Sequence, residues 1–335
     1  MVPRITVVGA TGKQGGSVVQ TFLQHGGYEV RGLTRSTENP KAQALAAQGV
    51  EIAQANFDDL DSLVKAFEGS DMIFGMTDFF IHFFTKSAEE AQAIESEQGK
   101  KIAQAAARTQ GLKSFIWSTL PDTKAISGGT AIVPHFQSKA DVDNYIREEL
   151  ADTLLPKTTF LYLASFIDNF YYPPFQPIYA GAIDKYVYIQ PQDKATLTPL
   201  LGDAQVNTGP YVLAIVKHAD LTKGGKTVLA SLGFETYEDV SKSLSKHLEK
   251  ELVFAKVDFP TYESIFPKWG AELGLNMLYF ERCPGESGWG SSGNTGVKPL
   301  LLQDLGLTIG KEIETWESGM QRMDWKTKFG PYAQK

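Results

Sequence analysis

Cysteine is almost absent from the sequence, which has Cys283 as its single cysteine in 335 residues. A disulfide within the chain is impossible and a metal site built on cysteines is excluded, which favours a reducing compartment such as the cytoplasm. Blocks of lysine and arginine are also absent and the net charge is −7, so we expect no direct nucleic-acid binding. No apolar run reaches the length of a membrane span, and the early first strand leaves no room for a signal peptide.

The stretch over residues 5–19 predicts a strand, a tight glycine turn and a helix. Apolar or β-branched residues form the strand, and Gly9, Gly12 and Gly15 follow at a spacing of three. In dinucleotide-binding folds these glycines permit the sharp turn, the close approach of a pyrophosphate and the close packing of helix on strand. The pyrophosphate then lies on free N–H groups at the positive end of the helix. This context favours a bound dinucleotide over a glycine turn without a ligand.

The second predicted strand, over residues 28–35, ends at Arg35 rather than at an acidic residue. NAD-binding sites usually place Asp or Glu there, which binds the ribose 2′-hydroxyl. An acidic side chain would repel a 2′-phosphate, whereas a guanidinium pairs with it. We therefore expect NADP(H) rather than NAD as the cofactor, with Lys41 as a second positive charge. The alternative is that Arg35 is only a solvated residue at the end of a strand.

The N-terminal half alternates predicted strands and helices, which is typical of the α/β class and of a doubly wound parallel (Rossmann) sheet. With 42% hydrophobic residues, the chain can build a sizeable core. Further strands are expected over 50–55, 71–77, 113–119 and 158–164, and helices over 40–49, 60–67, 88–110 and 134–146. We expect residues 1–165 to form an NADP-binding domain with returning segments near 202–232. Residues 166–335 would form a smaller, interleaved α/β domain for a substrate or partner.

In the C-terminal half, the boundaries of strands and helices are less clearly marked in the sequence. We expect strands over 185–189, 196–201, 226–230 and 252–257, and helices over 209–217, 236–246 and 262–277. The loop over 283–296 is rich in glycine and serine and is either a lid or without fixed structure.

Polar residues follow the predicted strands at their carboxyl ends, where the ligands of such sheets bind. Asn56 and Phe57 would lie beside the adenine, although Asn56 is also suited to capping the helix over 60–67. The other residues that we expect at the cofactor are Thr11, Lys13, Gln14, Thr77, Asp78, Phe79, Ser118, Lys139, Tyr162, Ala164, Ser165 and Phe166.

Two segments, 78–84 and 165–175, are dense in aromatic residues, and we expect the first of them to be a loop. Together they predict a broad apolar pocket that suits a large, flat or hydrophobic substrate. The expected pocket residues are Phe80, Phe83, His135, Asn169 and Tyr172. The same side chains would also serve as core between two domains, and the sequence leaves both interpretations open.

Four segments, over residues 9–15, 31–35, 135–139 and 166–170, resemble the NmrA-like family of atypical short-chain dehydrogenases/reductases, whose more distant relatives are isoflavone-reductase-like enzymes. The resemblance spans roughly residues 3–252. It implies a Rossmann domain that binds NADP, with Lys139 near the nicotinamide ribose. It does not imply one activity, because some relatives are redox-responsive regulators that bind the cofactor without turning it over. Others reduce quinones or similar compounds, and some serve fungal natural-product pathways.

His135 occupies the place of the usual tyrosine, four residues before Lys139 and on the same helix face. In short-chain reductases that tyrosine donates a proton to the substrate. A histidine is a competent proton donor or relay near neutral pH, so we take Lys139, His135 and Thr119 as the catalytic candidates, with a water as a further proton source. The alternative is a structural histidine at the start of a helix.

Two main functions remain open from the sequence, besides a scaffold that holds the cofactor and has neither of these roles. The first is an NADP-dependent enzyme acting on a large apolar molecule by hydride transfer or by a cofactor-assisted rearrangement or cyclisation. The second is a cofactor-sensing co-regulator that works through protein contacts, which the absent tyrosine and the acidic charge favour. We expect a cytoplasmic protein, also present in the nucleus if it is a regulator. The sequence leaves open a protein partner or a homodimer.

Overall fold

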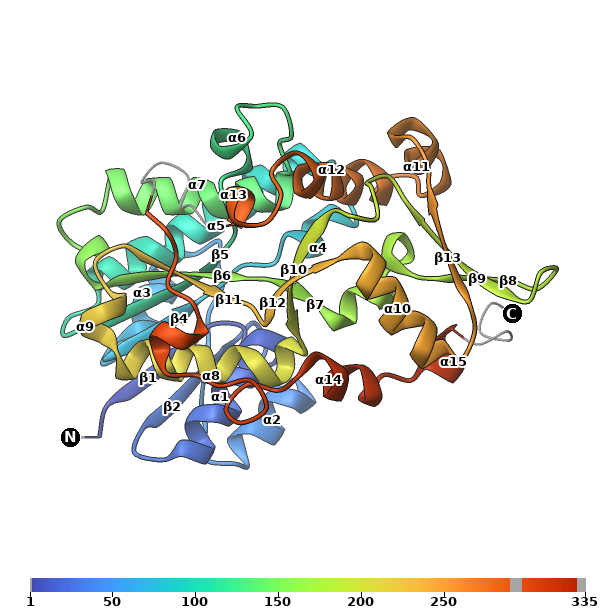
Figure 1. Cartoon of the computed structure of the whole chain (residues 1–335). Coiled ribbons are helices and arrows are strands. Elements are labelled where there is room, and N and C mark those ends of the chain that lie inside the picture. Colours follow the sequence, from blue (N-terminus) through green and yellow to red (C-terminus); the bar gives the residue numbers. More distant parts are fainter. Residues whose placement is uncertain (1, 290–296, 330–335) are drawn as a thin grey trace.

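A seven-stranded sheet forms the centre of the chain, seen here in a computed structural model that describes residues 2–289 and 297–329 (Figure 1). The strand order is β11-β6-β5-β4-β1-β2-β3, and every neighbouring pair is parallel. The strands are β1 (Arg4–Val7), β2 (Glu29–Thr34), β3 (Glu51–Gln54), β4 (Met72–Gly75), β5 (Ser114–Thr119), β6 (Thr158–Leu163) and β11 (Lys226–Ala230). The prediction of a doubly wound parallel sheet is therefore confirmed.

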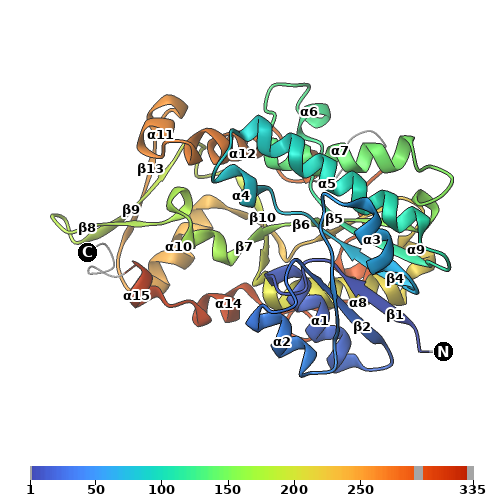
Figure 2. The ribbon, with the colours of Figure 1, turned by 180° about the vertical axis from the view of Figure 1, so that it is seen from behind.

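Helices cover both faces of this sheet (Figures 1 and 2). One face carries α1 (Lys13–His25), α2 (Pro40–Ala46) and α8 (Ala204–Lys217), and the other carries α3 (Leu60–Phe67), α5 (Ala88–Arg108) and α7 (Pro134–Glu148). The apolar stripe of α1, with Val18, Val19 and Phe22, is fully buried in the first core. Leu63 of α3 and Ile102 of α5 lie in the second core. Each helix thus buries one apolar face against the strands, as its sequence period requires.

Later parts of the chain complete the first core. Helix α8 and strand β11 return to the sheet from the C-terminal half. Leu300 forms a parallel bridge with Val228 of β11, and Leu305, Leu307 and Ile313 are buried in the same core as α1. The described C-terminal segment near 300–313 therefore packs on the nucleotide-domain side, which the sequence did not indicate. The division of the chain at residue 165 stays a prediction.

The remaining residues form two small sheets and a set of helices, some of which pack around a third core. The strands are β7 (Ser165–Phe166), β8 (Ile178–Ala180), β9 (Lys185–Gln190), β10 (Leu197–Gly202), β12 (Gly233–Thr236) and β13 (Leu252–Lys256). The helices are α9 (Ala219–Thr222), α10 (Tyr237–Leu248), α11 (Phe259–Ile265), α12 (Trp269–Arg282), α13 (Glu286–Trp289), α14 (Trp316–Arg322) and α15 (Trp325–Phe329). Short 3-10 helices are η1 (Leu155–Lys157), η2 (Ile167–Tyr171), η3 (Pro173–Phe175) and η5 (Leu302–Leu305). Strands β10 and β12 pair antiparallel, whereas β13 and β9 pair parallel.

Several predicted elements differ from the structure. The expected loop over 78–84 contains helix α4 (Phe79–Phe83), whose first turn is capped by the Asp78 carboxylate. Helix α6 (Thr123–Ile126) follows β5 at a place where the sequence predicted no helix. The helix expected over 209–217 starts earlier, at Ala204, and tolerates Pro210 inside it. The helix expected over 262–277 is split into α11 and α12 at Pro267, because the residue before a proline avoids the helical conformation. The loop expected over 283–296 contains α13 up to residue 289, and its residues 290–296 lie outside the described part.

Candidate functional site

The glycine turn joins β1 to α1 with very little space between backbone atoms. Gly9 has a φ of +68°, a conformation that favours glycine, and the Gly12 N–H donates to the Gly9 carbonyl oxygen at 2.8 Å. A Cβ atom on Gly15 would lie 2.3 Å from that same oxygen. No side chain caps α1 and its first turn carries no acidic residue. The helix N-terminus therefore presents free N–H groups and positive potential to an anion.

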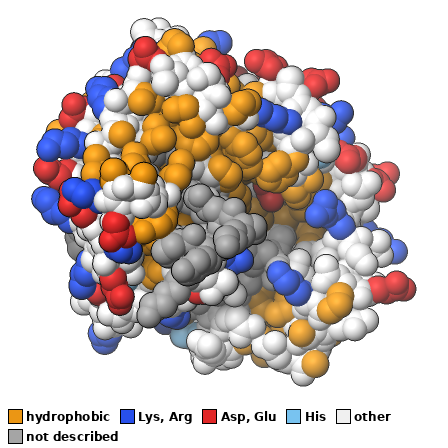
Figure 3. Space-filling view, turned by 90° about the vertical axis from the view of Figure 1, so that its right-hand side faces the viewer, with side chains coloured by type: hydrophobic (Ala, Val, Ile, Leu, Met, Phe, Trp, Pro, Cys, Tyr) orange, Lys and Arg blue, Asp and Glu red, His pale blue; other side chains and the backbone are white. Residues whose placement is uncertain are grey.

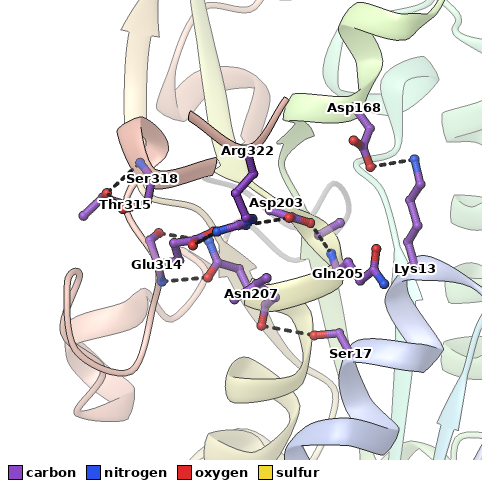
Figure 4. A network of polar contacts seen from close by, with 12 residues as sticks. Lys13, Ser17, Asp168, Asp203, Gln205, Asn207, Glu314, Thr315, Ser318 and Arg322 are labelled. Atoms are coloured by element: carbon purple, nitrogen blue, oxygen red, sulfur yellow. Dashed lines mark hydrogen bonds and ion pairs between the residues drawn. The ribbon is translucent and has the colours of Figure 1, made fainter. Parts of the chain in front are cut away.

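Lys13, in the first turn of α1, reaches across to the C-terminal part of the chain. Its Nζ lies 2.6 Å from an oxygen of Asp168 in η2 (Figure 4). Close by, Arg322 of α14 pairs with Asp203 and Glu314. Lys13 is about half exposed, with 48% of its side-chain surface accessible, so it remains available for a second anionic contact. Thr11 of the turn is half-buried.

Arg35 lies exposed after β2, and its guanidinium forms no ion pair or hydrogen bond within residues 2–289 and 297–329. The backbone carbonyl of Arg35 accepts a hydrogen bond from the Gln54 side chain at 3.0 Å, which joins the ends of β2 and β3. Arg31, which lies earlier in β2, is buried and donates to the carbonyl oxygens of Ala66 and Glu68. Of these two arginines, Arg35 is therefore the one that is free to meet a phosphate.

The residues expected beside the adenine have local roles as well. The Asn56 side-chain oxygen accepts from the Asp58 backbone N–H at 3.0 Å, while Asp59 caps α3 by accepting from two N–H groups. Phe57 is half-buried and packs against the second core. Asn56 is exposed, so this Asx turn leaves its amide accessible, and contact with a base stays a prediction.

The next strand ends supply two polar groups of different kinds. The Ser118 hydroxyl at the end of β5 donates to the Gln14 side-chain oxygen at 2.8 Å, which joins this strand to the first turn of α1. Thr77, just after β4, is buried and its hydroxyl has no hydrogen-bond partner within the described chain. Buried hydroxyls are normally paired. An orphaned one at the carboxyl edge of the sheet fits a ligand that supplies the missing partner.

The end of β6 and the segment after it contribute both buried and half-buried groups. Tyr162 and Ala164 are buried, and burial raises the pKa of the Tyr162 hydroxyl well above its usual range. Tyr162 lies in an apolar cluster together with Phe136 of α7. Ser165 and Phe166 are half-buried, and the Ser165 hydroxyl lies 3.3 Å from that of Thr198. Contacts of these residues with a cofactor stay predictions.

Lys139 on α7 is held by a buried acid that the sequence analysis missed. Its Nζ donates to one oxygen of Glu95 on α5, and the Ser138 hydroxyl donates to the other oxygen. The Glu95 side chain is fully buried and that of Lys139 is 12% exposed. The signal was present in the sequence, because Glu95 shares the inward face of α5 with Ala91 and Ile102.

His135, one turn earlier on α7, contacts a second buried acid, Glu272 of α12. One carboxylate oxygen of Glu272 accepts from the His135 backbone N–H at 3.0 Å and lies 2.5 Å from the ring Nδ1. The Glu272 side chain is 1% exposed and that of His135 is 13% exposed. Helix α12 thus carries an acid on its buried face, beside Leu273, and the sequence analysis did not select it.

An aromatic cluster surrounds the His135 ring. We use this name for Phe79, Phe80, Phe83, Tyr172 and Trp269. The Phe80 ring lies 5.5 Å from the His135 ring, 5.8 Å from Trp269 and 6.3 Å from Tyr172 between centroids. Phe79 and Phe83 are buried, whereas Phe80 and Tyr172 retain accessible surface. Four of the five predicted pocket residues, Phe80, Phe83, His135 and Tyr172, are therefore together, and Trp269 is an addition. Asn169, which shortly precedes Tyr172 in the sequence, is half-buried. Its side chain forms no hydrogen bond within the described chain.

Thr119 is the last residue of β5, and it is buried. Its hydroxyl donates weakly to the Leu120 carbonyl oxygen at 3.5 Å, and it is 1% exposed. The neighbouring acid is Asp143 of α7, which is also buried. Burial raises the pKa of the Asp143 carboxyl well above its usual value, and the nearby Thr119 hydroxyl and Arg147 charge offset this only in part.

This raised pKa predicts that Asp143→Asn stabilises the protein near neutral pH. Below pH 3.9, which is about the pKa of an aspartate in the unfolded chain, the Asp143 carboxyl holds its proton in both the folded and the unfolded state. The protonated carboxyl therefore contributes its full stability there. As pH rises towards the folded pKa, only the unfolded chain ionises and that contribution is lost. Asparagine resembles the protonated acid and avoids this loss. Thermal unfolding should give the variant a higher Tm at about pH 7.5 and a smaller gain at about pH 4. A variant that is equally destabilised at both pH values would contradict the assignment.

Membrane spans, metal sites and a separate cavity bear on other functions of the described residues. No helix in that part is both long and apolar enough to cross a membrane. No group of three or more histidine, cysteine, aspartate or glutamate side chains there is arranged to hold a metal ion. A cavity of about 240 Å³ is lined by Leu200, Val240, Ser243 and Trp316, among others, and none of its lining residues belongs to the site described above.

The parallel sheet and the uncapped glycine turn define a Rossmann-fold protein, and comparison with known sequences identifies its family. The profile of the NmrA-like family matches residues 1–293. The chain therefore belongs to the NmrA-like family. A relative from Aspergillus hancockii, the NmrA-like family domain-containing oxidoreductase hkm9, is 32% identical over 177 residues. The match covers 53% of this chain and 50% of that protein, so the chain spans about half the length of this relative.

Solved structures show the same fold. NmrA, a negative transcriptional regulator determined in complex with NADP, superposes with a TM-score of 0.72 at 22% identity, covering 96% of both chains. The triphenylmethane reductase of Citrobacter sp., determined with NADP(H), gives a TM-score of 0.63 at 20% identity, covering 96% of this chain and all of that one. At these identities the likeness confirms the fold.

Proposed function

We propose that the chain binds NADP(H) at the glycine turn and acts as an oxidoreductase on a large apolar or aromatic small molecule. The observation that carries the proposal is the arrangement of α7, which places His135 and Lys139 one turn apart, with the aromatic cluster around the His135 ring. The A. hancockii relative is named an oxidoreductase and the Citrobacter protein a reductase. Both names support this class of reaction for the present chain.

The described residues fit the parts of NADP(H) one by one. The free N–H groups of α1 suit the pyrophosphate, the unpaired Arg35 guanidinium suits the 2′-phosphate, and the orphaned Thr77 hydroxyl suits a polar group of the nicotinamide half. Lys139 has three N–H donors, of which Glu95 occupies one, so two remain for ribose hydroxyls. When bound, the nicotinamide supplies or accepts hydride.

His135 is the best-placed residue to manage the proton. It lies beside the accessible ring of Phe80, whereas the Thr119 hydroxyl is buried and directed to the Leu120 carbonyl. The accessible faces of Phe80 and Tyr172 would lie against a flat or hydrophobic substrate. The same arrangement suits a cofactor-assisted rearrangement or cyclisation, in which no net reduction occurs. A role in natural-product biosynthesis belongs to this proposal, since members of the family serve such pathways.

A substrate screen tests the proposed function. Purified protein with NADPH would be offered quinones and aromatic carbonyl compounds, and NADPH consumption would be followed by its absorbance. We expect turnover with at least one compound, and about a hundredfold lower kcat in His135→Gln. Saturable NADPH binding without turnover of any compound would contradict the enzyme and favour the regulator described below.

Arg35→Asp should reverse the cofactor preference. The substitution replaces the cation that pairs with the 2′-phosphate by an anion that repels it, and an aspartate there can bind the 2′-hydroxyl of NADH instead. We expect NADPH affinity to fall at least about tenfold, or about 1.4 kcal/mol, while NADH affinity holds or rises. Calorimetric titration of both nucleotides measures the two changes.

The matched control is Arg108→Asp. Arg108 is an exposed arginine that ends α5, and β5 starts shortly after it at Ser114. It therefore lies at the amino edge of the parallel sheet, opposite the proposed site, and the same change of charge there should leave both affinities unaltered. Equal losses in the two variants would mean that Arg35 acts only through net charge.

A regulator that senses the cofactor is the second candidate. The superposed NmrA is described as a negative transcriptional regulator, and here His135 replaces the usual tyrosine. Hydrophobic side chains gather on the face shown in Figure 3, and such a surface supports protein contacts. The exposed apolar residues include Val253 of β13 and Ile265 of α11. The regulator would bind its partner with different affinities in the presence of NADP⁺ and of NADPH. Identical affinities with the two forms would exclude it.

A further inference from the structure

Glu272 is a buried acid whose hydrogen bonds go entirely to His135. Its Oε1 oxygen accepts from the His135 backbone N–H at 3.0 Å and lies 2.5 Å from Nδ1. The second oxygen, Oε2, is buried and has no partner within the described chain. An acid that is 1% exposed is costly unless donors compensate it. Because both donors belong to one residue, Glu272 and His135 form a unit that joins α12 to α7.

The geometry determines which ring nitrogen carries a proton. An ionised carboxylate only accepts hydrogen bonds, and the backbone N–H already directs one to Oε1. With Glu272 ionised, the contact between Nδ1 and the same oxygen places the ring proton on Nδ1. In a histidine, the hydrogen bond made by one ring nitrogen determines whether the other ring nitrogen carries a proton.

The other nitrogen, Nε2, is the one left for chemistry. It forms no hydrogen bond within residues 2–289 and 297–329, and the His135 ring packs beside both Phe79 and Phe80, at 5.9 and 5.5 Å between centroids. His135 also retains 13% of its side-chain exposure. A flip of the ring about its Cβ–Cγ bond would put Cδ2 in the place of Nδ1 and break the 2.5 Å contact with Glu272.

We propose that Glu272 is a positioning residue for the proton transfer, which holds His135 with Nδ1–H on the carboxylate and Nε2 available to the substrate. The inference rests on the proposed function. When the ring is charged, Nε2 gives its proton to an oxygen of the substrate, and the ring remains neutral with its proton on Nδ1. In the reverse direction, the neutral Nε2 accepts the proton of a substrate hydroxyl. Glu272 touches no reacting atom and acts only through His135.

The first measurement is the nitrogen NMR spectrum of the histidine rings. The chain has five histidines, so His135 can be assigned by its loss in His135→Gln. At a pH where the ring is neutral, we expect Nδ1 to be protonated in the wild type. In Glu272→Leu, the population should shift towards the Nε2–H form that free histidine prefers. A wild type protonated on Nε2, or an unchanged tautomer in Glu272→Leu, would overturn the proposal.

Glu272→Gln provides a second test if the leucine variant does not fold. The amide oxygen still accepts from the backbone N–H and Nδ1–H, but it no longer places a carboxylate beside the ring. We expect kcat to fall about tenfold or more while the KM for NADPH is unchanged. Glu281→Gln is the control, because Glu281 is on the same helix and pairs with Lys256 instead. Equal kcat values in the two glutamine variants would contradict the role of Glu272.

The two measurements separate this inference from the proposed function. If no compound is turned over but the tautomer shifts in Glu272→Leu, the enzyme hypothesis fails and the hydrogen-bonded unit stands. If turnover is observed and the tautomer does not depend on Glu272, the enzyme hypothesis stands and the positioning role is wrong.

Discussion

Gly15→Ala will abolish high-affinity NADPH binding. The added Cβ would lie 2.3 Å from the Gly9 carbonyl oxygen and 2.9 Å from the Ala10 nitrogen, distances at which backbone atoms must move apart. The glycine turn would be displaced from the first turn of α1, and the N–H groups that face the pyrophosphate would diverge. We expect calorimetry to show at least about a hundredfold weaker binding, or about 2.7 kcal/mol.

Gly16→Ala is the control for this prediction. It is the next residue in the same helix, and its Cβ would meet the Ala10 carbonyl oxygen at 3.5 Å, an ordinary contact. Alanine also has the higher helix propensity, so this variant should fold and bind NADPH like the wild type. Thermal unfolding of both proteins identifies any general loss of stability. Undiminished NADPH binding in a folded Gly15→Ala protein would show that the cofactor does not lie on this turn.

Lys139→Met will remove both turnover and a large part of the stability. The ammonium is the ion-pair partner of Glu95, whose side chain is fully buried. Removing one partner of a buried pair leaves an uncompensated charge and costs about 3–5 kcal/mol. The same substitution removes the donors that we assign to the nicotinamide ribose. We expect a clear fall in urea midpoint, together with the loss of NADPH oxidation.

The double variant Lys139→Met/Glu95→Gln separates these two effects. Neutralising Glu95 removes the uncompensated charge, while the Ser138 hydroxyl still has an oxygen to which it can donate. Stability should therefore recover most of its loss, because replacing both partners of a buried pair is far less costly than replacing one. Turnover should not recover. If the double variant regained activity, Lys139 would act only by stabilising the fold.

The central sheet could be predicted because its signals are local in the sequence. Glycine spacing, buried strands and amphipathic helices are each read within a window of about 15 residues, and helix α3 was predicted with the bounds that the structure has. The C-terminal half was harder. Strand β7 has two residues and β8 has three, which is too short for a periodic pattern. Helix α4 has five residues, of which only His82 is polar, so it has no clear polar face to mark it as a helix.

The candidate site was predictable where one segment supplies the whole signal, as in the glycine turn or the His135 and Lys139 pair. Its two buried acids were not, because each depends on a contact between distant elements. Glu95 meets Lys139 across 44 positions, and Glu272 meets His135 across 137. A charged residue on the inward face of a helix signals that a partner exists, but only the packing of α5 and α12 on α7 identifies it.

The most direct measurement is a calorimetric titration of the wild type with NADP⁺, NADPH, NAD⁺ and NADH. The account predicts saturable binding with at least about a tenfold preference for the phosphorylated pair, or about 1.4 kcal/mol, because Arg35 is unpaired and no acid occupies the end of β2. Equal binding of both pairs would contradict the role of Arg35. Absence of binding by any of the four would contradict the central claim and leave the glycine turn as structure alone.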